Sequence, residues 1–141
     1  MKPLNIKHII IFSFLIFFSF SALGQDISLE KCDLFLKPGY VSDGQEYIAK
    51  LDENNVATFY TTFYGGSHYR VIGCTDISSI PLILNVYDTE KNLLFSNKDH
   101  DYTNYWNFTF KSTIDCIIEI KFDVEKRIHD EVMLLIGFKE K

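Results

Sequence analysis

One short polar segment holds the residues of this chain whose types and spacing are best suited to bind a ligand. Asn97, Asp99 and Asp101 supply side-chain oxygens at alternate positions, and calcium ions prefer several oxygen ligands from one loop. This spacing matches the start of an EF-hand loop. The rest of that motif is missing, because Tyr102 takes the place of the turn glycine and Phe108 that of the bidentate glutamate. We therefore expect a solvated loop between strands, with a weak calcium site as the alternative.

Aromatic residues flank the same segment and suggest a second chemistry. Tyr102 and Tyr105 lie next to its carboxylates, and tyrosine rings beside polar groups can stack on sugar rings. Trp106 alternates with polar residues in phase with Phe108 and Phe110, which places its ring on the core side of a strand. The ligand-binding candidates are therefore the residues at the rim of the loop, with a glycan or a protein as the partner: Asp99, Asp101, Tyr102 and Tyr105.

The histidines of the chain do not form a catalytic pattern. Ser67 and His68 are neighbours in a β-rich segment, where adjacent side chains point to opposite faces and cannot act as nucleophile and base. His100 and His129 lie in charged connections, and no Gly-x-Ser-x-Gly motif is present. The sequence predicts a protein without catalysis, and a small secreted hydrolase or a protease inhibitor is the alternative.

Three cysteines could form one disulfide bond. Cys32, Cys74 and Cys116 allow three pairings, and their spacing does not choose among them. Each cysteine could also be a small buried apolar residue. The spacings typical of a structural zinc site are absent, so the sequence predicts no metal or cofactor apart from the weak calcium candidate.

The N-terminus resembles a secretory signal peptide. Lys2 and Lys7 precede a nearly unbroken apolar run over residues 9–20, and small residues follow at 21–24, before an expected cleavage at Gln25. A membrane anchor is the alternative, but this run of about 12 residues is shorter than the roughly 20 that a spanning helix needs. We expect the protein to be exported, either secreted or periplasmic.

Cleavage of residues 1–24 would leave 117 of the 141 residues, which suits a single domain over residues 25–141. That part carries 12 basic and 19 acidic residues, a net charge of −7. An acidic chain without a basic patch argues against a nucleic-acid partner. No second long apolar run occurs, so we expect no membrane span after cleavage.

Hydrophobic alternation with a period of two predicts strands throughout this domain. The clearest case is 113–123, where one face would carry Ile114, Cys116, Ile118, Ile120 and Phe122. Residues 132–138 alternate similarly but are apolar on both faces, so that strand should be covered on both sides. Further strands are expected at 45–51, 81–87, 93–96 and 104–111. About eight short strands indicate an all-β, antiparallel jelly-roll-like sandwich, with a closed barrel as the alternative.

The strongest hairpin signal lies between residues 56 and 74. Gly65-Gly66 separates two β-rich segments there, and paired glycines suit a two-residue hairpin turn. Such a turn would place Ala57 opposite Cys74 on the same face of one sheet. A longer loop would shift this register, which the sequence leaves open.

The order of segments resembles the small secreted β-sandwich modules related to bacterial pre-peptidase C-terminal domains. The resemblance rests on GQEYIAKL (44–51), YRVIGC (69–74), LILNVYDTEKNLLFSN (82–97), NYWNFTF (104–110) and TIDCIIEIKF (113–122). It implies an eight-stranded jelly-roll-like sandwich with a non-catalytic accessory or binding role. Such modules are normally appended to a secreted enzyme, whereas we expect residues 25–141 to form a single domain. The resemblance carries over no ligand residues.

Overall fold

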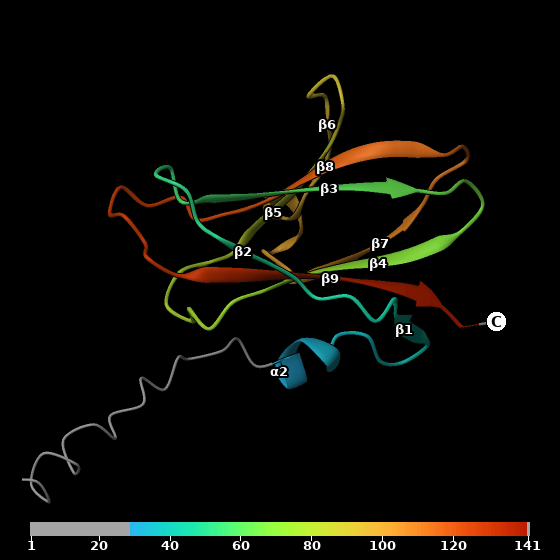
Figure 1. The fold of residues 1–141 in the computed structure, drawn as a ribbon, viewed down its shortest axis with the longest axis horizontal. Coiled ribbons are helices and arrows are strands. Elements are labelled where there is room, and N and C mark those ends of the chain that lie inside the picture. The colour runs from blue at the N-terminus through green and yellow to red at the C-terminus, as the bar shows by residue number, and fades with distance from the viewer. Residues whose placement is uncertain (1–28, 141) are drawn as a thin grey trace, which may run out of the picture.

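Two antiparallel β-sheets face each other in the computed structural model, which describes residues 29–140 (Figure 1). The five-stranded sheet contains β1 (Tyr40–Ser42), β2 (Tyr47–Lys50), β9 (Glu131–Lys139), β4 (His68–Cys74) and β7 (Tyr105–Thr109). The four-stranded sheet contains β3 (Val56–Phe63), β8 (Ile114–Lys121), β5 (Ile83–Asp88) and β6 (Leu93–Ser96). The described residues also form a short helix, α2 (Leu29–Asp33), and one 3₁₀ turn, η1 (Asn97–His100). The predicted β-sandwich is confirmed, whereas the predicted signal peptide lies outside the described residues.

The strand pairing is that of a jelly roll. β2 pairs with β9, β3 with β8, β4 with β7 and β5 with β6, so the antiparallel pairs are nested around one connection. β1 and β2 both pair with β9 and act as one interrupted strand. This nesting is a long hairpin rolled up so that consecutive pairs alternate between the two sheets. The jelly-roll topology expected from the sequence is therefore confirmed.

The hairpin predicted around Gly65-Gly66 is wrong. A tight turn does form there, with the Ser67 N–H donating to the Tyr64 carbonyl oxygen at 3.4 Å. The strands on either side then separate, because β3 joins the four-stranded sheet and β4 joins the five-stranded sheet. Ala57 consequently faces Ile120 in the register of β3 and β8, and not Cys74.

Backbone contacts at this turn explain its glycines. A Cβ atom on Gly65 would lie 2.8 Å from the Cα of Ser112, so a side chain there would collide with the neighbouring loop. Gly66 has a φ of +80°, a conformation that glycine adopts without steric cost. The glycines thus allow a crossing from one sheet to the other, packed closely against the loop that follows β7.

The space between the sheets is filled by the inward side chains of both. On β8 the alternation predicted from the sequence is confirmed, because Cys116, Ile118 and Ile120 are all buried in this core. Burying side chains of this size contributes about 1.5–3 kcal/mol each before the cost of ordering the chain. Strand alternation therefore accounts for most of the core.

A second apolar layer covers the outer face of the five-stranded sheet. We call residues 29–39 the N-terminal cover; they include α2, which lies against this sheet in Figure 1. The cover places Cys32 and Leu36 over Met133 and Leu135 of β9 and over neighbouring side chains of β4. β9 is thus buried on both faces, as its double apolar pattern predicts. No helix among residues 29–140 is long and apolar enough to cross a membrane.

Candidate functional site

The segment predicted to bind a ligand follows β6, and Asn97 holds it in place. The Asn97 side chain is fully buried; its Oδ1 accepts the N–H of Leu84 at 2.9 Å. Its Nδ2 donates to the carbonyl oxygens of Leu82 at 2.9 Å and Thr103 at 3.0 Å. In this structure the amide therefore ties both ends of the loop to β5.

The other two calcium candidates lie in a different environment from Asn97. Asp99 and Asp101 are exposed at the surface of the loop. Among residues 29–140 no group of three or more His, Cys, Asp and Glu side chains is arranged to hold a metal ion. The structure thus keeps two of the three predicted ligands at the surface and directs the third into the core.

Two consecutive residues of this loop have a left-handed backbone. Asp101 and Tyr102 have φ values of 53° and 54°, and the Thr103 N–H donates to the His100 carbonyl oxygen at 3.1 Å. This is the pattern of a type I′ turn, which strongly prefers Asn-Gly and Asp-Gly sequences. Tyrosine at the second central position costs roughly 1–2 kcal/mol relative to a right-handed conformation. The turn nevertheless presents a tyrosine, with 40% of its surface exposed.

Tyr102 forms one wall of a hollow at the end of the sandwich, which we call the Tyr102 hollow. It has a volume of about 420 Å³ and lies between the η1–β7 loop and the β4–β5 connection, residues 75–82. Its polar lining residues are Thr75, Ser78, Ser79, Tyr102 and Asn104, and the apolar ones are Ile77, Ile80, Pro81 and Leu82. No charged side chain belongs to this lining among the described residues. The hollow combines an aromatic ring with neutral hydrogen-bonding groups.

Tyr105 lies on a different surface from Tyr102. Its half-buried ring packs on Phe35 of the N-terminal cover, with ring centroids 5.9 Å apart, and on the Arg70 guanidinium, 4.6 Å from the ring centroid. Trp106 faces the core side as predicted, where its ring stacks on Phe95 at a centroid distance of 5.0 Å and meets His100 at 4.1 Å in a tilted arrangement. The structure therefore does not bring the four predicted binding residues together, because β7 begins at Tyr105 and alternation turns its ring outward.

The three histidines of the described residues lie apart from one another. His68 Nδ1 lies 2.7 Å from the Thr109 hydroxyl, and the His100 ring contacts the Trp106 ring in a tilted arrangement. His129 lines a charged hollow of about 380 Å³ together with Asp130, but no hydroxyl or thiol belongs to that lining among the described residues. Within residues 29–140 no carboxylate is hydrogen-bonded to any of these imidazoles, so the orienting acid of a catalytic triad is missing from each.

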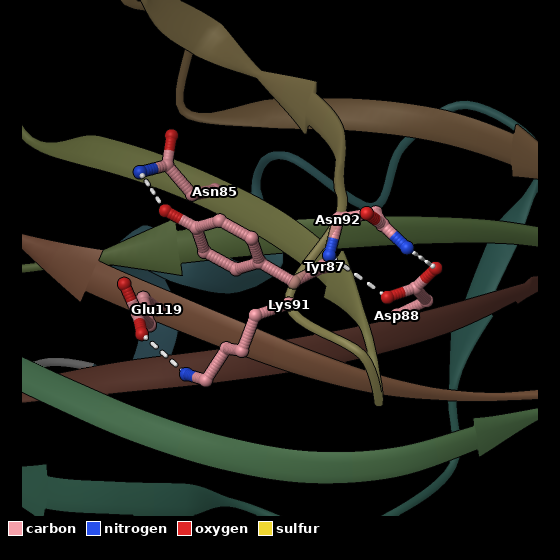
Figure 2. A network of polar contacts seen from close by, with 6 residues as sticks. All are labelled: Asn85, Tyr87, Asp88, Lys91, Asn92 and Glu119. Carbon is pink, nitrogen blue, oxygen red and sulfur yellow. Dashed lines mark hydrogen bonds and ion pairs between the residues drawn. The ribbon is translucent and has the colours of Figure 1, made fainter.

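The β5–β6 turn contains the polar network shown in Figure 2. Asp88 accepts hydrogen bonds from the backbone and side-chain N–H groups of Asn92 at 2.9 and 2.8 Å. These bonds hold the pKa of the Asp88 carboxyl below its usual range. The Lys91 Nζ pairs with a carboxylate oxygen of Glu119 on β8 at 3.1 Å, and the Asn85 amide donates to the Tyr87 hydroxyl. The attachment of this turn to β8 had no signal in the sequence.

A jelly-roll β-sandwich is the class of protein that the fold defines. No protein-family model matches the chain, and no curated protein matches its sequence. The resemblance to modules related to pre-peptidase C-terminal domains therefore stays a prediction.

Proposed function

We propose that this protein is an exported, non-catalytic binding module that holds a glycan in the Tyr102 hollow. The observation that carries the proposal is a tyrosine kept in a left-handed turn, where glycine would have the lower backbone energy. Conformations of this kind cluster at ligand sites, where the side chain is needed more than the local stability. Here that side chain forms a wall of the hollow.

The chemistry of the lining favours a sugar over an ion. Hydroxyl and amide groups both donate and accept hydrogen bonds, as the hydroxyl groups of a sugar do. The Tyr102 ring offers an apolar face for the C–H side of a pyranose. The volume of about 420 Å³ falls within the range of small-molecule sites. A neutral lining offers no counter-charge to a free ion, and loops on a rigid scaffold are where binding residues concentrate.

The disulfide bond supports export. Cys32 and Cys74 are joined in the structure, and disulfides persist in oxidising compartments outside the cytosol. A disulfide bond agrees with the predicted signal peptide, because a protein needs such a peptide to reach an oxidising compartment. A non-catalytic role fits the resemblance to accessory modules and the absence of an acid partner for the described histidines.

A glycan array with the protein expressed from the full chain and exported by its own leader tests this function. Tyr102→Ala should weaken binding to an identified glycan about tenfold, because it removes a stacking surface worth about 1.4 kcal/mol. Tyr60→Ala is the matched control, since Tyr60 is more exposed but lies on β3, outside the hollow. If no glycan binds, or if the two variants lose affinity equally, the proposal is wrong.

Tyr102→Gly separates binding from folding. Glycine adopts positive φ freely, so the variant should melt no lower than the wild type while losing glycan binding. A large fall in melting temperature would instead show that the ring is needed for packing, and would remove the argument from backbone strain.

A further inference from the structure

Arg70, in β4, is a buried charge without an acidic partner. Only 8% of its surface is exposed, and none of the ion pairs among residues 29–140 involves it. Arginine is rarely buried without an anion, because removing its charge from water is costly. The chain as a whole carries more acidic than basic residues, so carboxylates are not scarce. Among the buried polar and charged residues of the described part, Arg70 is the one that carries a charge.

Neutral groups hold the guanidinium in one orientation. Its Nε donates to Asn107 Oδ1 at 2.7 Å, and its Nη1 donates to the Phe35 carbonyl oxygen at 2.9 Å. The rings of Tyr40 and Tyr105 both pack against it, at 4.1 and 4.6 Å from ring centroid to Cζ. The Arg70 Nη2 donates to no atom of the described residues. It is also not one of the solvent-inaccessible polar atoms that lack a hydrogen-bond partner, so an external group can reach it. A fixed, charged donor group is thus left for an external acceptor.

Neighbouring side chains add further donors on the same face of the sheet. In the register of β4 and β7, Arg70 lies opposite Asn107 and His68 lies opposite Thr109. Residues two apart on a strand share a face, so these four side chains form one group, which we call the Arg70 patch. Asn107 uses its oxygen for Arg70, which leaves its Nδ2 to donate outward. His68 uses its Nδ1 for Thr109, which leaves its Nε2 at the exposed edge.

We propose that the Arg70 patch binds an oxyanion: a carboxylate, a sulfate or a phosphate group. The oxygens of such a group accept hydrogen bonds from the Arg70 Nη2 and the Asn107 Nδ2, with His68 at the rim. A planar guanidinium fixed on both sides suits oxyanion recognition, and the bound charge compensates the buried arginine. This site lies on the outer face of the five-stranded sheet, and the proposal does not depend on glycan binding in the Tyr102 hollow.

Titration of the full-chain protein with sodium acetate, sulfate and phosphate, followed by amide NMR, tests the proposal. Sodium chloride at matched ionic strength corrects for general salt effects. We expect saturable changes in the amide chemical shifts, confined to β4, β7 and the N-terminal cover. Saturation by acetate alone identifies a carboxylate ligand, and saturation by sulfate or phosphate identifies a tetrahedral one. If none of the three anions saturates the patch, the proposal is overturned.

Two variants separate binding from folding. Asn107→Ala removes one donor to the anion and the acceptor of the Arg70 Nε, so it should lower the affinity for the anion about tenfold. His68→Ala leaves every hydrogen bond of Arg70 intact, so it should lower the affinity for the anion less than Asn107→Ala does. Thr58→Ala, on the exposed face of β3, is the matched control and should bind as the wild type does. Equal affinity in all three variants would mean that the anion binds elsewhere.

Discussion

The disulfide bond between Cys32 and Cys74 should supply a large part of the stability of this domain. It closes a loop of 42 residues, and the chain-entropy relation for a loop of this length gives about 4 kcal/mol at 25 °C. Small domains are typically stable by only about 5–15 kcal/mol. The double variant Cys32→Ser, Cys74→Ser should therefore lose a substantial fraction of its free energy of unfolding.

The position of the bond adds a local effect to this entropic one. It fastens the N-terminal cover over Ile72, Met133 and Leu135, which point away from the core between the sheets. Without it, the cover would be held mainly by Arg70 and by apolar contacts. Release of the cover would expose these apolar side chains, so the double variant should also bind a hydrophobic dye under native conditions.

Guanidinium denaturation followed by tryptophan fluorescence measures the effect. Trp106 is the only tryptophan of the chain, and its stacking on Phe95 at the core makes it a reporter of the sandwich. The control is Cys116→Ala, which keeps the disulfide and removes the free thiol. A difference below about 1 kcal/mol between wild type and double variant would refute the reasoning, since the loop would then impose little constraint on the unfolded chain.

Two further predictions concern buried groups. Asn97→Ala leaves the Leu84 N–H and two carbonyl oxygens without partners and should lower the free energy of unfolding by about 2–4 kcal/mol in urea denaturation. Burial, with smaller contributions from Asp115 and Asp88, raises the pKa of the Cys116 thiol to about 11 from its ordinary value of 9.0. The thiol of the unfolded chain therefore ionises at a lower pH than the buried thiol. The contribution of Cys116 to the free energy of unfolding is thus complete below pH 9 and falls as the pH rises toward 11. The urea midpoint of Cys116→Ala should not show this decline.

Local patterns in the sequence predict the strands because each strand has one face in the core. The alternation of β8 follows from burial alone, so its inward residues could be named before the partner strands were known. The partner of β3 could not be predicted in this way. The residues of β8 that pair with β3 lie 51 to 65 positions further along the chain, while Gly65-Gly66 specifies only that the chain reverses, not whether it stays in one sheet.

In the candidate sites, too, local sequence patterns predict some features, and tertiary contacts decide the others. Tyr102 was predicted because an exposed aromatic residue in a polar loop is visible in the sequence, but the turn that orients its ring is stabilised by tertiary contacts of Asn97. The surface on which Tyr105 lies could not be predicted, because the start of β7 decides the direction of its ring. Arg70 was missed although a signal existed: it stands between Tyr69 and Val71 in a segment that is otherwise apolar from Tyr69 to Cys74, where burying a charge costs free energy.

β4 connects the two proposed sites. Arg70 lies four residues before Cys74 on this strand, a distance of about 13 Å along an extended chain. The N-terminal cover is bonded to β4 at both points, by hydrogen bonds to Arg70 and by the disulfide to Cys74. The loop that lines the Tyr102 hollow begins directly after Cys74, and Lys31 of the cover pairs with Asp76 in that loop. The cover therefore holds β4 at two points, one at the Arg70 guanidinium and one at Cys74, where the loop that lines the hollow begins.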